Sequence, residues 1–169
     1  DCGVRLHNLI FFPDHILLKP GRLSEEEYEV MKTHTTIGAK TLLEVKEKFP
    51  NNRFLDMAIS ITHFHHEKWD GTGYPRGLSA TAIPLSARIM AVADVYDALR
   101  SKRVYKEAFS HAKSVQIIKE ESGKSFEPEI VEVFMGIQGE IQEIYDRYSG
   151  IQERTKAYLG AGCLGGTGA

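Results

Sequence analysis

The chain has 169 residues and 42% hydrophobic content, which suits one domain with its own core and is too little for two independent domains. Its 21 lysines and arginines nearly balance its 23 aspartates and glutamates, and the formal charge of -2 gives no long-range field that would attract a nucleic-acid polymer or an anionic membrane. No apolar run approaches the roughly 18 residues of a membrane span, and the N-terminus lacks the residue order of a signal peptide. Two cysteines near the chain ends argue against a disulfide framework, so we expect a soluble cytoplasmic protein.

The first predicted helix spans residues 24–48. Ser24 and Glu27 have the spacing of a capping box, and apolar residues recur at helical intervals as far as Val45. Pro50 then ends the pattern. This helix carries one histidine of later interest, His34.

A second predicted helix ends in a pair of histidines. Its apolar periodicity begins at Leu55 and leads to His65 and His66. Residues 70–75, Asp-Gly-Thr-Gly-Tyr-Pro, must then be a loop. The sequence therefore places the histidine pair at a helix end that faces this loop.

Three more helices are predicted after the loop. Pro84 is expected to be the first residue of one of them, because its missing N–H would be unpaired there in any case. Its predicted buried stripe consists of Leu85, Ile89, Val92, Tyr96 and Leu99. A short helix over residues 110–122 and a last one that begins at Pro128 follow. No segment alternates with period two, so the predicted fold class is all-α.

The two ends of the chain differ from this body. Residues 1–12 mix apolar and polar types without a clear period and are expected to form an irregular segment. Residues 151–169 end in a glycine-rich stretch with little to bury and are expected to be a disordered tail. The domain itself is predicted over residues 13–150.

The histidine pair and the residues after it have the composition of a metal site. His65, His66, Glu67 and Asp70 combine imidazole nitrogens with carboxylate oxygens, which suit iron, manganese or zinc. Two glycines and a proline in residues 70–75 are typical of an active-site loop. A tight interhelical turn remains the alternative. His63 is expected to be a core residue more than a support for the ligands.

Two further groups have residue types that suit phosphate chemistry. Asp94 and Asp97 lie three residues apart on one predicted helix face. A cap or a surface ion pair is the alternative reading of these two aspartates. After them comes a basic cluster of Arg100, Lys102, Arg103 and Lys106. This cluster is either a local source of phosphate-binding charge or a solvated basic face.

Several ungapped blocks resemble the HD-GYP subgroup of the HD phosphohydrolase superfamily, in the same order. The main blocks are residues 65–78, 83–89 and 92–99. Residues 13–21, residues 31–34 with Gly38, and residues 123–128 fit the same family. The resemblance covers residues 12–134.

The resemblance implies an HD-domain-like helical bundle. It also implies two divalent metal ions, iron or manganese, and hydrolysis of the bacterial messenger cyclic di-GMP to the linear dinucleotide or GMP. By position, the implied metal ligands are His34, His65, His66 and Asp94, of which His66 and Asp94 are also the implied catalytic residues. The positions that contact the nucleotide match Tyr74, Arg103 and Lys106. Residues expected to orient the histidines and the loop are Glu67, Asp70, Gly71, Gly73 and Pro75.

The chain departs from this family near its start. The His-Asp dyad that gives the superfamily its name has no counterpart around residues 5–9, so we expect a bundle that is incomplete at the N-terminus and holds fewer metal ions. The alternative to an enzyme is a degenerate module that binds cyclic di-GMP, or a diguanylate-cyclase domain through the Gly73-Tyr74-Pro75 loop. A hydrolase that acts on another phosphate ester is the weaker third hypothesis.

Overall fold

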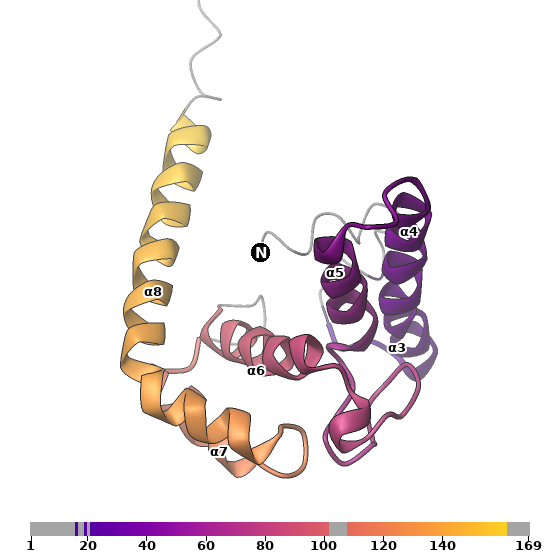
Figure 1. Ribbon diagram of the computed structural model, residues 1–169. Helices are drawn as coiled ribbons and strands as arrows, with labels where there is room; N and C mark the ends of the chain where they lie inside the picture. Colours follow the sequence, from indigo (N-terminus) through magenta and orange to yellow (C-terminus); the bar gives the residue numbers. More distant parts are fainter. Residues whose placement is uncertain (1–15, 17–18, 20, 102–107, 162–169) are drawn as a thin grey trace, which may run out of the picture. The chain divides into compact units, whose positions relative to one another are not determined.

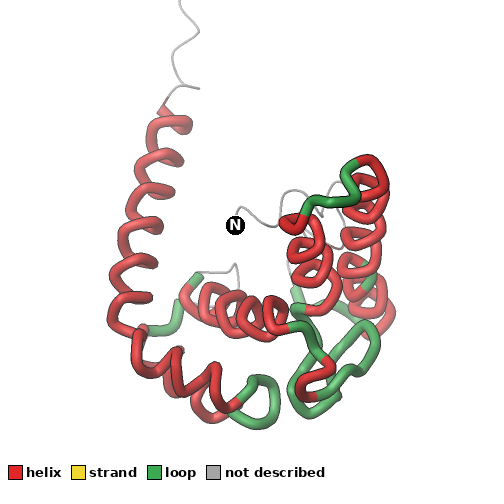
Figure 2. The backbone as a smooth tube through the Cα atoms, viewed as in Figure 1, coloured by secondary structure: helices red, strands yellow, loops and turns green. Residues whose placement is uncertain are grey.

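The structure is a computed structural model that describes residues 16, 19, 21–101 and 108–161, with side chains as far as residue 148. The chain divides into two compact units, Asp1–Glu132 and Val133–Ala169, and each is described by itself. Helices and loops make up the described residues, and none of them belongs to a named strand (Figure 2). The predicted all-α fold class is confirmed. Among the described helices, none has the length and apolar content that crossing a membrane would require.

The first unit contains five α-helices and a short 3₁₀ helix among its described residues (Figure 1). These are α3 (Glu25–Lys32), α4 (His34–Lys48), α5 (Arg53–Phe64), η1 (Ala80–Ala82), α6 (Leu85–Arg100) and α7 (His111–Glu120). Along the chain each helix packs on the next, α3 on α4, α4 on α5, α5 on α6 and α6 on α7. A last helix, α8 (Pro128–Ala161), begins in this unit and continues through the second.

Local signals in the sequence start several of these helices. Ser24 forms the predicted capping box: its hydroxyl accepts from the Glu27 amide at 3.2 Å, and its own amide donates to the Glu27 carboxylate at 2.7 Å. Asn52 caps α5, and Ser110 caps α7. Pro84 is the residue before α6 and not its first helical residue. Capping thus fixes where α3, α5 and α7 begin.

The single helix predicted over residues 24–48 is wrong, because the chain turns at Thr33 between α3 and α4. Three threonine hydroxyls donate to carbonyl oxygens three residues earlier: Thr33 to Val30 at 2.6 Å, Thr35 to Lys32 at 3.0 Å and Thr36 to Thr33 at 2.8 Å. Such side-chain bonds compete with the helical ladder and bend it. Periodicity alone does not detect this competition.

The predicted buried stripe of α6 is partly wrong. Val92 and Tyr96 are buried, but Leu85 and Ile89 are 56% and 51% exposed. Ala87 and Ala91 occupy the buried face in their place. Small side chains allow neighbouring segments to approach the helix closely, so the buried face follows the alanines and not the largest residues.

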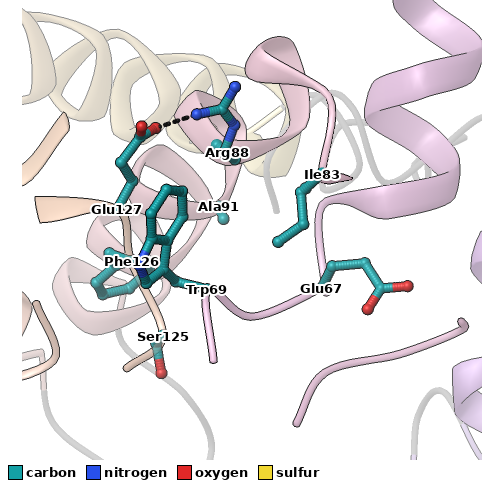
Figure 3. A pocket seen from close by; sticks show the side chains of 8 residues that line it. All are labelled: Glu67, Trp69, Ile83, Arg88, Ala91, Ser125, Phe126 and Glu127. Carbon is teal, nitrogen blue, oxygen red and sulfur yellow. Dashed lines mark hydrogen bonds and ion pairs between the residues drawn. The ribbon is translucent and has the colours of Figure 1, made fainter. Parts of the chain in front are cut away.

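A buried ion pair joins α6 to the residue before α8 (Figure 3). The Arg88 guanidinium donates to the Glu127 carboxylate at 2.5 Å, and the two side chains are 13% and 9% exposed. The same guanidinium lies over the Trp69 ring, 5.8 Å from its centroid. The cavity that remains in this region is only about 10 Å³ in volume, and its lining includes Ile83, Ala91 and Phe126. The junction is therefore tightly packed.

The end of the chain differs from its prediction. Residues 151–161, expected to be disordered, continue α8 as far as Ala161. Residues 152–159 contain neither glycine nor proline, so the backbone has no reason to stop there. Residues 162–169 lie outside the described part of the chain, as do residues 1–15, where the irregular segment was expected. The division into residues 1–12, 13–150 and 151–169 stays a prediction.

Candidate metal centre

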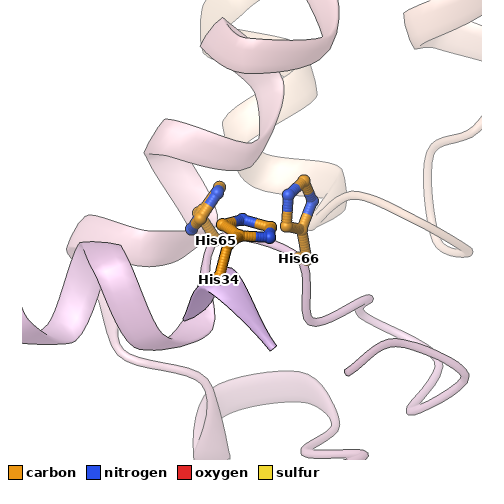
Figure 4. A group of neighbouring side chains, drawn as sticks. All are labelled: His34, His65 and His66. Atoms are coloured by element: carbon orange, nitrogen blue, oxygen red, sulfur yellow. The ribbon is translucent and has the colours of Figure 1, made fainter. Parts of the chain in front are cut away.

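Three histidines from two parts of the sequence, His34 and the adjacent pair His65 and His66, come together in the first unit (Figure 4). His34, His65 and His66 each offer one ligand atom, and these atoms all lie within 4.8 Å of one another. Their ring centroids are 5.5 Å apart for His34 and His65, 5.0 Å for His34 and His66, and 4.1 Å for His65 and His66. All three histidines could therefore coordinate one metal ion.

The three histidines lie at the ends of two helices. His34 is the first residue of α4, directly after the turn at Thr33. His65 is the C-cap of α5, and His66 follows it into the loop, as the sequence predicts. The break between α3 and α4 therefore contributes to the site, because it turns the chain immediately before His34.

Backbone carbonyls select the tautomer of two of the rings. The Nδ1 atom of His34 lies 2.7 Å from the carbonyl oxygen of Met31. That of His65 lies 2.9 Å from the carbonyl of Ile61 and 3.2 Å from that of Thr62. A carbonyl oxygen only accepts, so Nδ1 carries the proton in both rings and Nε2 carries the lone pair with which an imidazole coordinates a metal.

The loop after the histidines is folded around one buried carboxylate. Glu67 is 3% exposed and accepts from the backbone amides of Arg76 at 2.7 Å and Leu78 at 2.9 Å. Gly73 lies against the backbone here, since a Cβ on it would come within 2.3 Å of the Lys68 nitrogen and 2.5 Å of the Glu67 Cα. Glu67 thus holds the loop, and only glycine fits at position 73.

This loop puts the Tyr74 ring on the histidine cluster. The Tyr74 amide donates to the His66 carbonyl at 3.1 Å, and its ring stacks on the His66 ring at a centroid distance of 4.8 Å. The peptide bond between Tyr74 and Pro75 is cis. Burial raises the pKa of the Tyr74 hydroxyl strongly, and Tyr28 and Asp94 nearby raise it further. Tyr74 therefore stays a neutral phenol beside the cluster at physiological pH.

The remaining loop residues shape the loop. The exposed carboxylate of Asp70 accepts from the Thr72 amide at 2.9 Å and its hydroxyl at 2.7 Å, and these bonds lower the pKa of Asp70. Gly71 has a φ of +84°, which glycine adopts readily. The loop is also tied to residues 124 and 125, whose carbonyls accept from the Asp70 and Trp69 amides at 2.9 Å and 3.2 Å.

The other residues that the sequence indicated as functional lie on α6, on α5 or outside the described residues. Asp94 is half-buried on α6 and near enough to raise the pKa of Tyr74, but it is not among the three clustered ligand groups. Asp97 is half-buried on the same helix. His63 stacks on Phe64 at 4.3 Å, and partial burial, with the Arg76 charge, lowers its pKa. Residues 102–107, which include Arg103 and Lys106, lie outside the described residues.

Sequence reasoning missed the supports of the loop. Trp69, which directly precedes residues 70–75, packs against Arg88, and Arg88 pairs with Glu127; nothing in their periodicity indicates this. The signal that could have found them is their place inside the resembling blocks, residues 65–78, 83–89 and 123–128.

Comparison with known proteins then decides the family. A family model described as an HD domain matches residues 6–130. The chain belongs to the HD-domain family. The resemblance on which the sequence analysis relied is therefore confirmed, together with the all-α fold that it implies.

Relatives of this HD domain carry related names. A Vibrio cholerae protein named cyclic di-GMP phosphodiesterase is 53% identical over 135 residues, which are 79% of this chain and 27% of the relative. A Thermotoga maritima protein of the same name is 45% identical over 144 residues, 84% of this chain and 38% of the relative. The chain is also 39% identical over 132 residues, 77% of its length and 24% of the relative, to a Vibrio cholerae 3'3'-cGAMP-specific phosphodiesterase 2. The HD domain described here thus spans only about a quarter to two fifths of these relatives.

The donors of this HD domain fit a divalent metal ion. The rings of His34 and His65 have their protons fixed on Nδ1, and His66 lies between them and Tyr74. Neutral imidazoles suit iron, manganese or zinc. Backbone carbonyls bound to the far ring nitrogen are the usual way in which proteins orient metal-ligating histidines.

Proposed function

We propose that this HD domain is the catalytic part of a metal-dependent phosphodiesterase that hydrolyses cyclic di-GMP to the linear dinucleotide or GMP. The observation that carries the proposal is the cluster of His34, His65 and His66 within 4.8 Å, with carbonyls holding Nδ1 of His34 and His65. Two relatives named cyclic di-GMP phosphodiesterase, at 53% and 45% identity, support the substrate.

The metal ligands in this proposal are the three histidines and Asp94. The half-buried Asp94 carboxylate raises the pKa of Tyr74, whose ring stacks on His66, and in this proposal it supplies the oxygen donor that the family resemblance implies. Iron or manganese suits this mixed set. A bound divalent ion would supply a water of lowered pKa and neutralise charge on the phosphoryl oxygens.

The chain's own residues supply the rest of the site. Tyr74 presents a hydrogen-bonding phenol and a flat ring to the nucleotide beside His66. Arg103 and Lys106 neutralise phosphate charge. Glu67, with Gly73, keeps Tyr74 in place through the loop.

The proposal also includes the location of the protein in the cell and its protein partners. Cyclic di-GMP is a messenger inside the bacterial cell, so the proposed location is the cytoplasm. Diguanylate-cyclase domains are the proposed protein partners, through the Gly73-Tyr74-Pro75 loop. All three residues are partly exposed and so reachable.

The test combines metal analysis with turnover. The purified chain is loaded with manganese or ferrous iron, its metal content is measured by elemental analysis, and cyclic di-GMP products are separated by chromatography. We expect bound metal and turnover, both lost in His66→Ala. The matched control is His63→Ala, a histidine in the last turn of α5, three residues before His66, that lies outside the clustered ligands.

Two outcomes separate the enzyme from its alternative. Loss of metal and products in His66→Ala, with both retained in His63→Ala, supports the phosphodiesterase. Tight binding of cyclic di-GMP by a chain that holds no metal and releases no product overturns it in favour of a binding module.

A further inference from the structure

Helix α3 places Tyr28 and Lys32 next to the Tyr74 ring, which stacks on His66. Tyr28 and Lys32 are four residues apart and so share a face of the helix. The Tyr28 ring meets the Tyr74 ring edge-on at a centroid distance of 6.3 Å. The Lys32 ammonium lies 5.4 Å from the Tyr28 centroid and 5.8 Å from the Tyr74 centroid. The positive charge of Lys32 therefore lies beside the Tyr74 ring, which itself stacks on the His66 ring.

The contacts of this ammonium are of a kind that a ligand can replace. Its carboxylate partner is Glu29, at 2.5 Å, and the Glu29 side chain is 64% exposed. An ion pair with so exposed a partner is weak, because water and salt screen it. The two tyrosine rings attract the ammonium without using its N–H donors in normal hydrogen bonds. Lys32 can thus exchange Glu29 for another anion and stay over the rings.

We propose that Lys32 is a substrate-binding residue whose ammonium, positioned by Tyr28 and Tyr74, binds a phosphate of the cyclic dinucleotide. This inference rests on the function proposed above. The chain has a net charge of -2, so an anionic ligand needs local cations at the site. A lysine offers three donors on a flexible stem, which can follow a phosphate as the ligand settles on the cluster.

Lys32 is separate in the sequence from the two basic residues that the family resemblance implies. Lys32 belongs to α3, whereas Arg103 and Lys106 follow α6 in the sequence. A ligand with two phosphates, such as a cyclic dinucleotide, needs more than one cation to balance its charge. Tyr28, which is 47% exposed, keeps the ammonium near the cluster while part of its own ring still faces solvent.

Substitution of Glu29 can distinguish a ligand-binding role of Lys32 from a purely structural role. If Lys32 served only to stabilise α3, removal of the Glu29 charge would leave ligand affinity unchanged. If Lys32 binds phosphate, Glu29 competes with the ligand for the ammonium, and the neutral glutamine should increase the affinity.

The experiment is a calorimetric titration of cyclic di-GMP into the full chain with manganese present, at low and at physiological salt. We expect Lys32→Met to raise Kd by about tenfold, as the loss of one charge-assisted contact implies, and Lys32→Arg to restore most of the affinity. Glu29→Gln should lower Kd by about two- to threefold, with the gain largest at low salt. The matched control is Lys119→Met, which removes the same charge from an exposed position on α7.

Circular dichroism of each variant checks that α3 and the other helices are intact. A Lys32→Met chain that binds as tightly as the unsubstituted chain overturns the inference, and so does an unchanged Kd in Glu29→Gln. Either result leaves the phosphodiesterase proposal standing, because metal content and turnover depend on the histidines. An unsubstituted chain that binds metal but no cyclic di-GMP overturns both.

Discussion

The two sides of the histidine cluster are built in different ways. On the loop side, His66 leads into a segment that is held by the buried Glu67 carboxylate and by Gly73 packed against the backbone. On the helix-junction side, His34 follows a turn with three threonine hydroxyl bonds, of which those of Thr33 and Thr36 lie at exposed residues and that of Thr35 is buried. The loop side is therefore fixed by buried contacts, whereas two of the three local bonds at the junction can be replaced by water.

This difference sets the expected size of mutational effects. A buried donor or acceptor that loses its partner also loses access to water, whereas an exposed one is solvated at once. Substitutions on the loop side should therefore lower stability and disturb Tyr74 together. Substitutions at the junction should change metal affinity with little loss of stability.

The largest effect is expected from Gly73→Ala. The added methyl group would meet backbone atoms of Lys68 and Glu67 at 2.3 Å and 2.5 Å, and backbone cannot move aside as a side-chain end can. We expect a loss of about 4 kcal/mol in the free energy of unfolding, measured by urea denaturation, and loss of turnover.

The matched control for this substitution is Gly139→Ala. Gly139 lies within α8, and apart from the adjacent backbone of its own helix no heavy atom comes within 4 Å of an added Cβ. Alanine there should raise stability by up to about 1 kcal/mol. Equal losses in the two variants would show that the close approach at Gly73 is not what holds the loop.

The next largest effect is expected from Arg88→Met. This change leaves the Glu127 carboxylate, 9% exposed, without its cation and removes the guanidinium from the Trp69 ring. Breaking a buried pair should lower stability by about 3 kcal/mol. The double variant Arg88→Met with Glu127→Gln should recover part of this loss, and no recovery would mean that packing on Trp69 matters more than charge.

A smaller effect is expected from Glu67→Gln. The amide group replaces one of the two oxygens that accept from Arg76 and Leu78, so one bond of 2.7 Å or 2.9 Å is lost. We expect a loss of about 2 kcal/mol in stability and a raised KM for cyclic di-GMP, because Tyr74 shifts with the loop. A changed metal content with unchanged KM would mean that Glu67 acts on the histidines and not on the loop.

The same contrast explains what the sequence could predict. Periodicity and capping residues give the order of the helices and the histidine pair at the end of α5, because these are local properties. His34 entered only through the family resemblance, since its approach to His65 depends on how α4 packs on α5. The turn at Thr33 and the buried bonds of Glu67 were not predictable, because hydroxyl competition and loop closure leave no periodic signal.

The smallest effect on stability is expected from Thr33→Val. Valine keeps the shape of threonine but cannot donate to the Val30 carbonyl, so the competition that favours the turn is weakened. Because the site is exposed, the free energy of unfolding should change by roughly 0.5 kcal/mol, while α3 and α4 become more nearly one helix. His34 would then rotate away from His65 and His66, and we expect manganese affinity, measured by calorimetry, to fall about fivefold or more as a supporting group is lost. Thr41→Val, which removes an exposed hydroxyl bond to the Ile37 carbonyl further along α4, is the matched control. Equal metal affinities in both variants and the unsubstituted chain would show that helix packing alone, and not the turn, places His34.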